Sequence, residues 1–208
     1  SHDQAVCYDP AAREAFRAEH GLTGKFIVMY SGNHSPCHPL DTTLAVAEGL
    51  KTESQFHFLF VGGGSEFKKV QAFQSKHALT NITTLPYQPM EKLSGSLSSA
   101  DLHLVVMGEP FVGIVHPCKI YNILTLGLPF LFIGPEESHG GDLSRRLNEP
   151  LHAGLKRHGD AVAIMAHISE VAARGPQPPN PAAQTLGAEF SHSILCPRLV
   201  QVIEEAGR

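Results

Sequence analysis

A lysine stands at the start of a predicted helix in the stretch between Glu109 and Pro129. Pro117 is a residue type favoured at the first position of a helix, so Lys119 falls in the first turn. The amino end of a helix carries partial positive charge, which disfavours a cation there unless an anion lies nearby. The pattern points to phosphate binding at Lys119, with the alternative that its side chain bends away into solvent.

Other loop residues raise the question of metal or nucleophilic chemistry. Two loops that would share one sheet edge contain His34, Cys37, His38, His116 and Cys118. Their spacing matches no recognised zinc finger, and chance clustering is expected with 13 His in the chain, so no metal is expected. No cysteine has the sequence signature of a catalytic thiol, and the sequence lacks the Gly-x-Ser-x-Gly elbow of a serine nucleophile.

Two Gly-containing loops could approach an anion. One covers residues 31–39 and leads into a helix whose amides would point at the ligand, and the other covers residues 62–65. Neither has the Gly-x-Gly-x-x-Gly or Gly-Lys-Ser/Thr phosphate pattern, so each alone is equally compatible with a plain turn.

Continuous apolar runs alternate with helical segments along most of the chain. Strands are expected at 26–30, 56–61, 81–85, 102–107 and 129–133, with another near 152–155. Helices are expected at 10–20, 40–50, 66–79, 90–100, 119–126, 142–147 and 160–173. This alternation predicts an α/β fold, a doubly wound, Rossmann-like parallel sheet with helices on both faces. Ligands of such sheets bind beyond the carboxyl ends of the strands, where these loops gather.

The composition of the chain argues against several classes of protein. The chain has 208 residues, 16 Lys and Arg against 20 Asp and Glu, and a formal net charge of −4, so a nucleic-acid partner is not expected. Its longest apolar runs are far shorter than a membrane span. Four widely spaced cysteines and no secretory leader favour a cytoplasmic location.

The expected division of the chain has four parts. Residues 25–174 form the Rossmann-like domain, 175–181 a Pro-rich linker, and 182–208 a C-terminal helix with an apolar stripe that needs a surface to pack on. The chain opens on Ser1 without a Met, which favours a fragment. Residues 1–24 are then the linker and helix that lead in from a preceding domain.

Five segments in a fixed order resemble a known domain. They are Met29–Asn33, Phe60–Gly64, Leu85–Pro89, Ser99–Leu104 and Pro117–Asn122. Together they resemble the C-terminal, nucleotide-sugar donor-binding domain of GT-B glycosyltransferases of family 4 (glycosyl transferases group 1), in particular enzymes of bacterial envelope and exopolysaccharide synthesis. The resemblance runs from Lys25 to the C-terminal helix.

The resemblance implies one half of a GT-B fold, with the active site in a cleft between two Rossmann-like domains. It implies a retaining glycosyltransferase of hexosyltransferase type that moves a sugar from a UDP- or GDP-linked donor to a glycan or lipid-linked acceptor in polysaccharide biosynthesis. No metal or other cofactor is implied. The partners would be the nucleotide sugar and a preceding acceptor domain, with peripheral membrane association of the longer protein, and this half alone would be inactive.

Site residues carry over by position. The resemblance places Gly32, Asn33 and His34 near the diphosphate and sugar, Leu85, Pro86 and Tyr87 at the base, Gly113, Ile114, Val115, Lys119 and Ile120 at the phosphates, and Asn122 at the ribose. Lys119 would stabilise the charge that develops on the leaving diphosphate.

The sequence also departs from the family pattern. The second of the family's paired glutamates is replaced by Asn122, Ile114 stands eight residues before it, and Glu109 is the candidate for the first. Asn33 and His38 occupy the positions of a basic pair, which leaves Lys119 as the remaining cation. Two alternatives therefore stay open: an enzyme like the nucleotide-sugar 2-epimerases, or a non-catalytic nucleotide-binding module.

Overall fold

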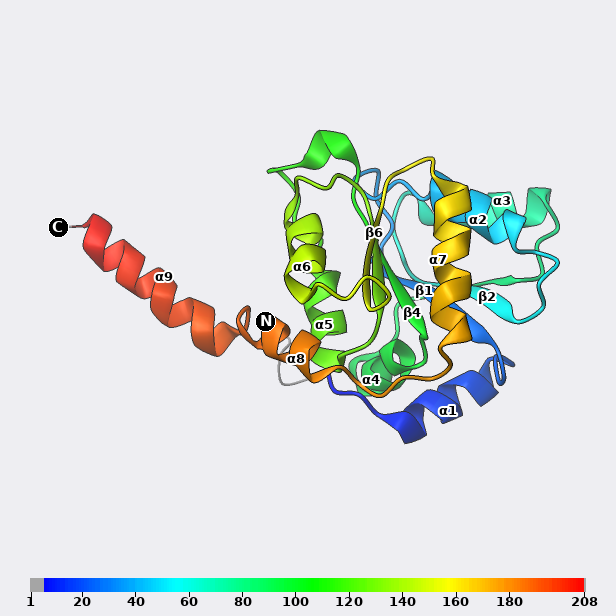
Figure 1. Cartoon of the computed structure of the whole chain (residues 1–208), viewed down its shortest axis with the longest axis horizontal. Coiled ribbons are helices and arrows are strands. Elements are labelled where there is room, and N and C mark those ends of the chain that lie inside the picture. Colours follow the sequence, from blue (N-terminus) through cyan, green and yellow to red (C-terminus); the bar gives the residue numbers. More distant parts are fainter. Residues whose placement is uncertain (1–5, 208) are drawn as a thin grey trace.

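The protein, described by a computed structural model over residues 6–207, is built on a six-stranded sheet (Figure 1). All strands are parallel, in the order β3-β2-β1-β4-β5-β6. They are β1 (Phe26–Asn33), β2 (Phe56–Gly63), β3 (Ile82–Leu85), β4 (Leu102–Val106), β5 (Phe130–Ile133) and β6 (Ala153–Lys156). The predicted α/β, Rossmann-like class is confirmed, including the strand expected near 152–155.

Helices cover both faces of the sheet. One face carries α2 (Asp41–Gly49), α3 (Phe67–Lys76) and α7 (Ala161–Ala173). The other carries α1 (Pro10–Glu19), α4 (Met90–Ser98), α5 (Lys119–Leu126), α6 (His139–Leu147) and α8 (Pro181–Ala188). Crossovers between parallel strands are right-handed, so strands added on opposite sides of β1 place their helices on opposite faces.

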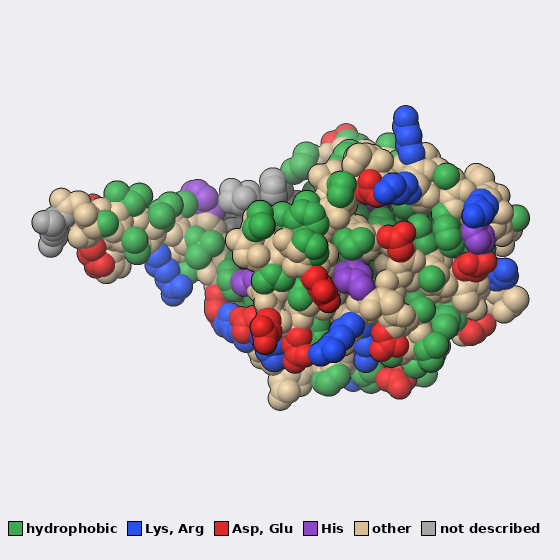
Figure 2. Space-filling view, turned by 90° about the horizontal axis from the view of Figure 1, so that it is seen from above, with side chains coloured by type: hydrophobic (Ala, Val, Ile, Leu, Met, Phe, Trp, Pro, Cys, Tyr) green, Lys and Arg blue, Asp and Glu red, His purple; other side chains and the backbone are tan. Residues whose placement is uncertain are grey.

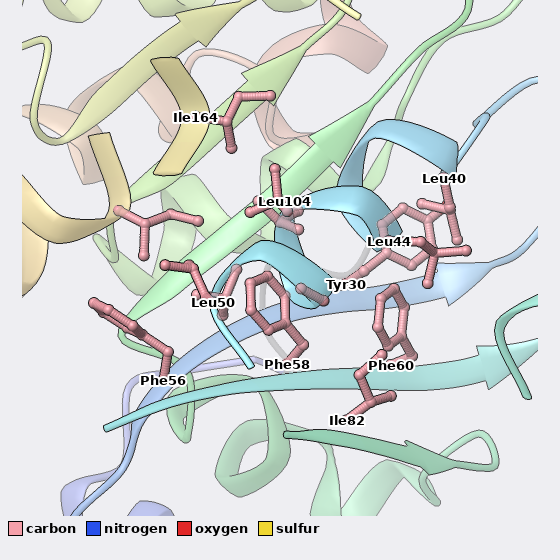
Figure 3. Packing of buried hydrophobic residues seen from close by; sticks show 14 of the residues in the cluster. Tyr30, Leu40, Leu44, Leu50, Phe56, Phe58, Phe60, Ile82, Leu104 and Ile164 are labelled. Carbon is pink, nitrogen blue, oxygen red and sulfur yellow. The ribbon is translucent and has the colours of Figure 1, made fainter. Parts of the chain in front are cut away.

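The core beneath α2 and α7 shows why the strands are unbroken apolar runs (Figure 3). Phe56, Phe58 and Phe60 are alternate residues of β2, so they point to one face and pack with Tyr30 of β1. Leu59, between them, is fully buried on the opposite face. A strand buried on both faces cannot show polar alternation.

Strands β1 and β2 run further than the sequence predicted. Residues 31–33 and 62–63, expected in loops, continue the parallel pairing, with Gly32 opposite Gly62 and Asn33 opposite Gly63. The expectation of loops there was wrong because glycine makes a close backbone approach possible. Gly62 has φ +133°, and a Cβ on it would lie 2.1 Å from the Gly32 carbonyl oxygen.

The predicted helix over 182–208 is instead two helices. Asn180 caps α8, with its side chain accepting from the Ala182 and Ala183 amides, so Pro181 starts this helix rather than ending the linker. A break near Ser191 precedes α9 (His192–Ala206). The expectations for residues 1–5 and 208 lie outside the described residues.

Helix α9 extends away from the body and buries none of its residues (Figures 1 and 2). Its apolar side chains include Leu199, Val202 and Ile203, which are 59%, 60% and 62% exposed. Across residues 6–207 no helix combines the length and apolar character needed to cross a membrane.

Helix α1 is held to the sheet by a buried ion-pair cluster. Asp101, just before β4, accepts from Arg13 Nη2 at 2.5 Å and from Arg17 Nη2 at 2.8 Å. Its Oδ2 also accepts from the Ile27 amide at 2.7 Å. One carboxylate thus joins α1, β1 and the entry to β4. The assignment of residues 1–24 to the connection from another domain stays a prediction.

We expect Asp101→Asn to lower the free energy of unfolding by about 3–5 kcal/mol, because it leaves two buried guanidinium groups without their counter-charge. Urea denaturation would measure the change. The matched control is Glu19→Gln, which removes an exposed pair with Lys92 at 3.2 Å and should cost less than about 1 kcal/mol. Equal losses in the two variants would contradict a structural role for Asp101.

Candidate functional site

A cavity of about 200 Å³ lies where β1 and β4 are neighbours. From β1 the chain adds strands on one side, and from β4 on the other, so the sheet has its topological switch point here. Five parts of the chain line the cavity: the end of β1, the loop after β3, α4, β4 and α5. The lining residues are Ser31, Gly32, Tyr87, Leu93, Leu97, His103, Leu104, Lys119, Asn122 and Ile123.

Lys119, the first residue of α5, turns its ammonium inward. Part of its side chain is accessible, but Nζ is buried and lies 3.2 Å from the centroid of the Tyr30 ring. Nζ has no hydrogen-bond partner among the described residues. Contact with the ring face gives the charged form of the side chain some cation–π stabilisation. Burial holds the pKa of Lys119 well below its usual value. The alternative of a lysine bent into solvent is therefore excluded.

Gly32 makes room for this lysine. A Cβ at Gly32 would lie 3.4 Å from Lys119 Cε and 3.6 Å from Nζ. Its φ of +125° belongs to the region that favours glycine. The backbone of β1 is therefore bare where the ammonium approaches it.

The groups around the ammonium supply no counter-charge. His34, His38 and His103 are buried, and burial lowers the pKa of each. The pKa is about 4 for His34 and His103, with the charge of Lys119 a further, smaller cause in each. No Asp or Glu is among the described residues that line the cavity. A buried amino group with only neutral neighbours takes up its proton more readily beside an anion, so this place suits an anion.

Tyr87 and Asn122 complete the predicted group. The Tyr87 side chain is 60% exposed, and its hydroxyl donates to the Gly63 carbonyl at 3.4 Å. Asn122 lies three residues after Lys119, on the same face of α5. The structure thus brings together four residues chosen from the sequence, Gly32, Tyr87, Lys119 and Asn122. Their roles toward a ligand stay predictions.

Other candidates lie outside this cavity. His34 is fully buried on the opposite face, in ring contact with Tyr30 and Phe67. Ile120 is buried in the core under α5. The exposed residues Asn33 and Pro86 and the half-buried Leu85 are at the strand ends but do not line it.

The loop after β4 lines different surfaces. Gly113, Ile114 and Val115 border a hollow of about 460 Å³ on the other side of the start of α5, together with His116 and His139. Glu109 borders a further hollow with Arg145 and Arg157. This loop lies at the top of Figure 1, and Figure 2 looks onto that side, where charged side chains of both signs gather.

The candidate metal ligands are engaged elsewhere. The Nδ1 atoms of His34 and His38 lie 3.0 Å from the Gly32 carbonyl oxygen and 2.7 Å from that of Val106. Carbonyl oxygens only accept, so both nitrogens donate. Within residues 6–207 no group of three or more His, Cys, Asp or Glu side chains is arranged to hold a metal ion.

His103 also lines the cavity, although the sequence did not single it out. It is 1% exposed within the otherwise apolar β4. Its Nε2 lies 3.0 Å from the Leu97 carbonyl oxygen, at the end of α4. The available signal was one polar residue inside an apolar run.

One curated relative matches in sequence, and no family model matches. WcaI of Escherichia coli (strain K12), a protein named as a colanic acid biosynthesis glycosyl transferase, is 31% identical over 103 residues. These residues are 50% of this chain and 25% of WcaI.

Solved structures resemble the whole chain. HepE (Alr3699) of Anabaena, in a complex with UDP and glucose, matches 97% of this chain with a TM-score of 0.78 at 13% identity, and 54% of HepE is covered. It also matches as a complex with UDP-glucose. Sucrose-phosphate synthase of Thermosynechococcus elongatus matches 99% of this chain with a TM-score of 0.72 at 20% identity, and 51% of the synthase is covered.

These comparisons confirm the resemblance to GT-B glycosyltransferases, and the fold is that of one half of such a protein. The chain spans about half the length of these solved structures.

We expect Lys119→Met to remove part of the pH dependence of stability. The lowered pKa of Lys119 means that the folded protein holds fewer protons than the unfolded chain between that pKa and 10.5. Stability should rise with pH across this window, by up to about 1.4 kcal/mol per pH unit for one proton. The variant should lack this contribution. Urea denaturation of both proteins between about pH 7 and pH 10 measures it, and parallel profiles would contradict it.

Proposed function

We propose that this chain is the donor-binding half of a retaining glycosyltransferase, which moves a sugar from a nucleoside diphosphate sugar to a glycan or lipid-linked acceptor in polysaccharide synthesis. The observation that carries the proposal is the buried, unpartnered ammonium of Lys119 at the switch point of the sheet. It stands at the first position of α5, where helix amides also favour negative charge.

We assign each part of the donor to a different part of the cavity. The diphosphate lies at Lys119 and the bare backbone of Gly32, and the ribose lies toward Asn122. The base lies against Tyr87 and the apolar side chains of Leu93 and Ile123. The sugar then lies outside the cavity, at the open edge of the sheet.

The chemistry explains why the cation is placed there. As the bond from the sugar to the diphosphate breaks, the leaving oxygen gains negative charge. A preformed cation shielded from water stabilises that charge more strongly than a solvated one, and it needs no reorganisation during the reaction. Lys119 fits this role because its amino group is already buried without a counter-charge in the free protein, so a diphosphate that binds beside it raises its pKa and favours the charged ammonium.

The names of the similar proteins support this proposal. WcaI is named for glycosyl transfer in colanic acid biosynthesis, and HepE forms complexes with UDP and UDP-glucose. A UDP-linked donor and a glycan product are therefore the first to test with this chain. The acceptor and water exclusion would come from another domain, so we expect this half alone to transfer nothing.

A second candidate is a nucleotide-binding module without transfer. Asn122 favours it, because a neutral amide stands where the family pattern has a glutamate. An assay of the longer protein distinguishes the transferase from the non-catalytic module. Incorporation of label from a UDP- or GDP-sugar into an acceptor fraction supports transfer. Donor binding without any incorporation supports the module.

Lys119→Met should weaken binding of UDP or GDP by about 1.5–3 kcal/mol while changing nucleoside binding little, because it removes a charge-assisted contact to phosphate. Calorimetric titration of this chain measures both ligands. Lys51→Met, which removes an exposed lysine 3.9 Å from Glu48, is the matched control and should change neither. Equal losses for nucleotide and nucleoside would take Lys119 out of the phosphate site.

Tyr87→Ala should weaken binding of the free nucleoside by about 1–3 kcal/mol, because it removes the aromatic surface for the base. Tyr87→Phe keeps the ring and removes the hydroxyl that donates to Gly63, so it should retain most of the affinity. Unchanged nucleoside affinity in Tyr87→Ala would mean that the ring only packs against β2.

A further inference from the structure

His103 lines the cavity, and its two ring nitrogens have different hydrogen-bonding roles. Its Nε2 lies 3.0 Å from the Leu97 carbonyl oxygen, which can only accept, so Nε2 carries the proton. Burial lowers the pKa of His103 to about 4, so the ring is neutral near pH 7. Nδ1 is therefore unprotonated and can only accept a hydrogen bond.

Nothing in the described chain uses this acceptor. His103 is 1% exposed and lines the cavity, yet Nδ1 has no hydrogen bond to another residue of 6–207. An acceptor in a residue of the cavity wall that has no partner in the protein is available to a hydrogen-bond donor of a ligand. The alternating pattern of β4 places the His103 side chain on the face beneath α4 and α5, where it forms part of the cavity wall.

The residues that line the cavity around His103 suit a flat ring such as a nucleotide base. Leu93 and Leu97 of α4 and Ile123 of α5 form apolar walls, and Tyr87 supplies an aromatic surface. Lys119 and Asn122 hold the polar side of the same cavity. A base that enters between these walls, with its phosphates toward Lys119, turns its far edge to His103.

That edge differs between bases in one decisive atom. Uracil and guanine carry a ring N–H on the Watson–Crick edge, whereas cytosine and adenine carry an unprotonated ring nitrogen at the same place. An acceptor such as Nδ1 pairs with the first type and opposes the lone pair of the second. Enzymes read isolated bases by hydrogen bonds to this edge.

We propose that His103 is a specificity-determining residue for the donor: its Nδ1 accepts a hydrogen bond from the ring N–H of the base, which selects uracil or guanine nucleotides against cytosine and adenine nucleotides. This inference rests on the proposed function, since it requires the nucleotide to occupy the cavity. It specifies the chemical class of the base in the donor and names the β4 side chain that selects this class.

The test compares nucleotides that differ at this atom. Calorimetric titration of this chain with UDP and CDP, and with GDP and ADP, measures the preference within each pair. We expect the ring N–H member of at least one pair to bind at least about tenfold more tightly, since a site built around a hydrogen bond rejects analogues that cannot make it.

Two variants distinguish recognition of the base by His103 from a purely structural role of this residue. His103→Gln can still donate to Leu97 but removes the acceptor at the Nδ1 position, so it should reduce the preference to about twofold or less. His103→Asn keeps an oxygen acceptor near Nδ1 and should retain most of the preference. Thermal denaturation reports whether each variant folds. Nitrogen-15 spectra of the wild-type imidazole provide a measurement that needs no variant: the Nδ1 signal should move with UDP or GDP and stay with CDP or ADP.

The other outcomes contradict either the role of His103 or the proposed function as a whole. Equal wild-type affinity within both pairs overturns the role of His103 and leaves donor binding intact. Equal losses for both members of a pair in His103→Gln would mean that Nδ1 contacts the ribose or only supports α4, which also overturns it. A wild-type chain that binds none of the four nucleotides overturns the proposed function and this inference together.

Discussion

The reversal of strand order between β1 and β4 is the constraint on which the site depends. Crossovers to β2 and β3 run over one face, and those to β4, β5 and β6 run over the other, so the connections diverge at this one place. The space between them admits the first turn of α5 beside the end of β1. Lys119 can therefore bury its amino group beside Gly32 and the Tyr30 ring of β1, a position that an uninterrupted strand order would close.

A buried ammonium costs stability, and the surrounding chain limits that cost without cancelling the charge. The Tyr30 ring offers its face, Gly32 leaves room, and neighbouring histidines stay neutral. A carboxylate at this place would stabilise the fold further but would compete with a phosphate. The chain places such a cluster elsewhere, where Asp101 binds Arg13 and Arg17 next to the amino ends of β1 and β4. Stability and binding thus use separate charges, as expected where function opposes local stability.

The sequence predicted the sheet well because buried parallel strands are apolar runs that need no context, as in 56–61 and 129–133. It failed where a residue's role depends on a distant neighbour. Gly62 of β2 pairs with Gly32 of β1 because the two backbones approach closely, which the residue types alone did not predict. His103 becomes informative only once Leu97 fixes its tautomer. Lys119 was found because its conflict with the helix dipole is local.

The dimensions of the cavity limit what this chain does alone. At about 200 Å³ the cavity is smaller than the roughly 300–1,000 Å³ of sites that enclose a small molecule, so under the proposed function the sugar of the donor stays outside it. Glycosyl transfer needs water kept from the reacting carbon, which an open sheet edge does not achieve. Under the proposed function the covering surface would come from another body, which fits similar solved structures about twice as long. Helix α9, with its apolar side chains exposed, is the part of the described chain best suited to contact that body.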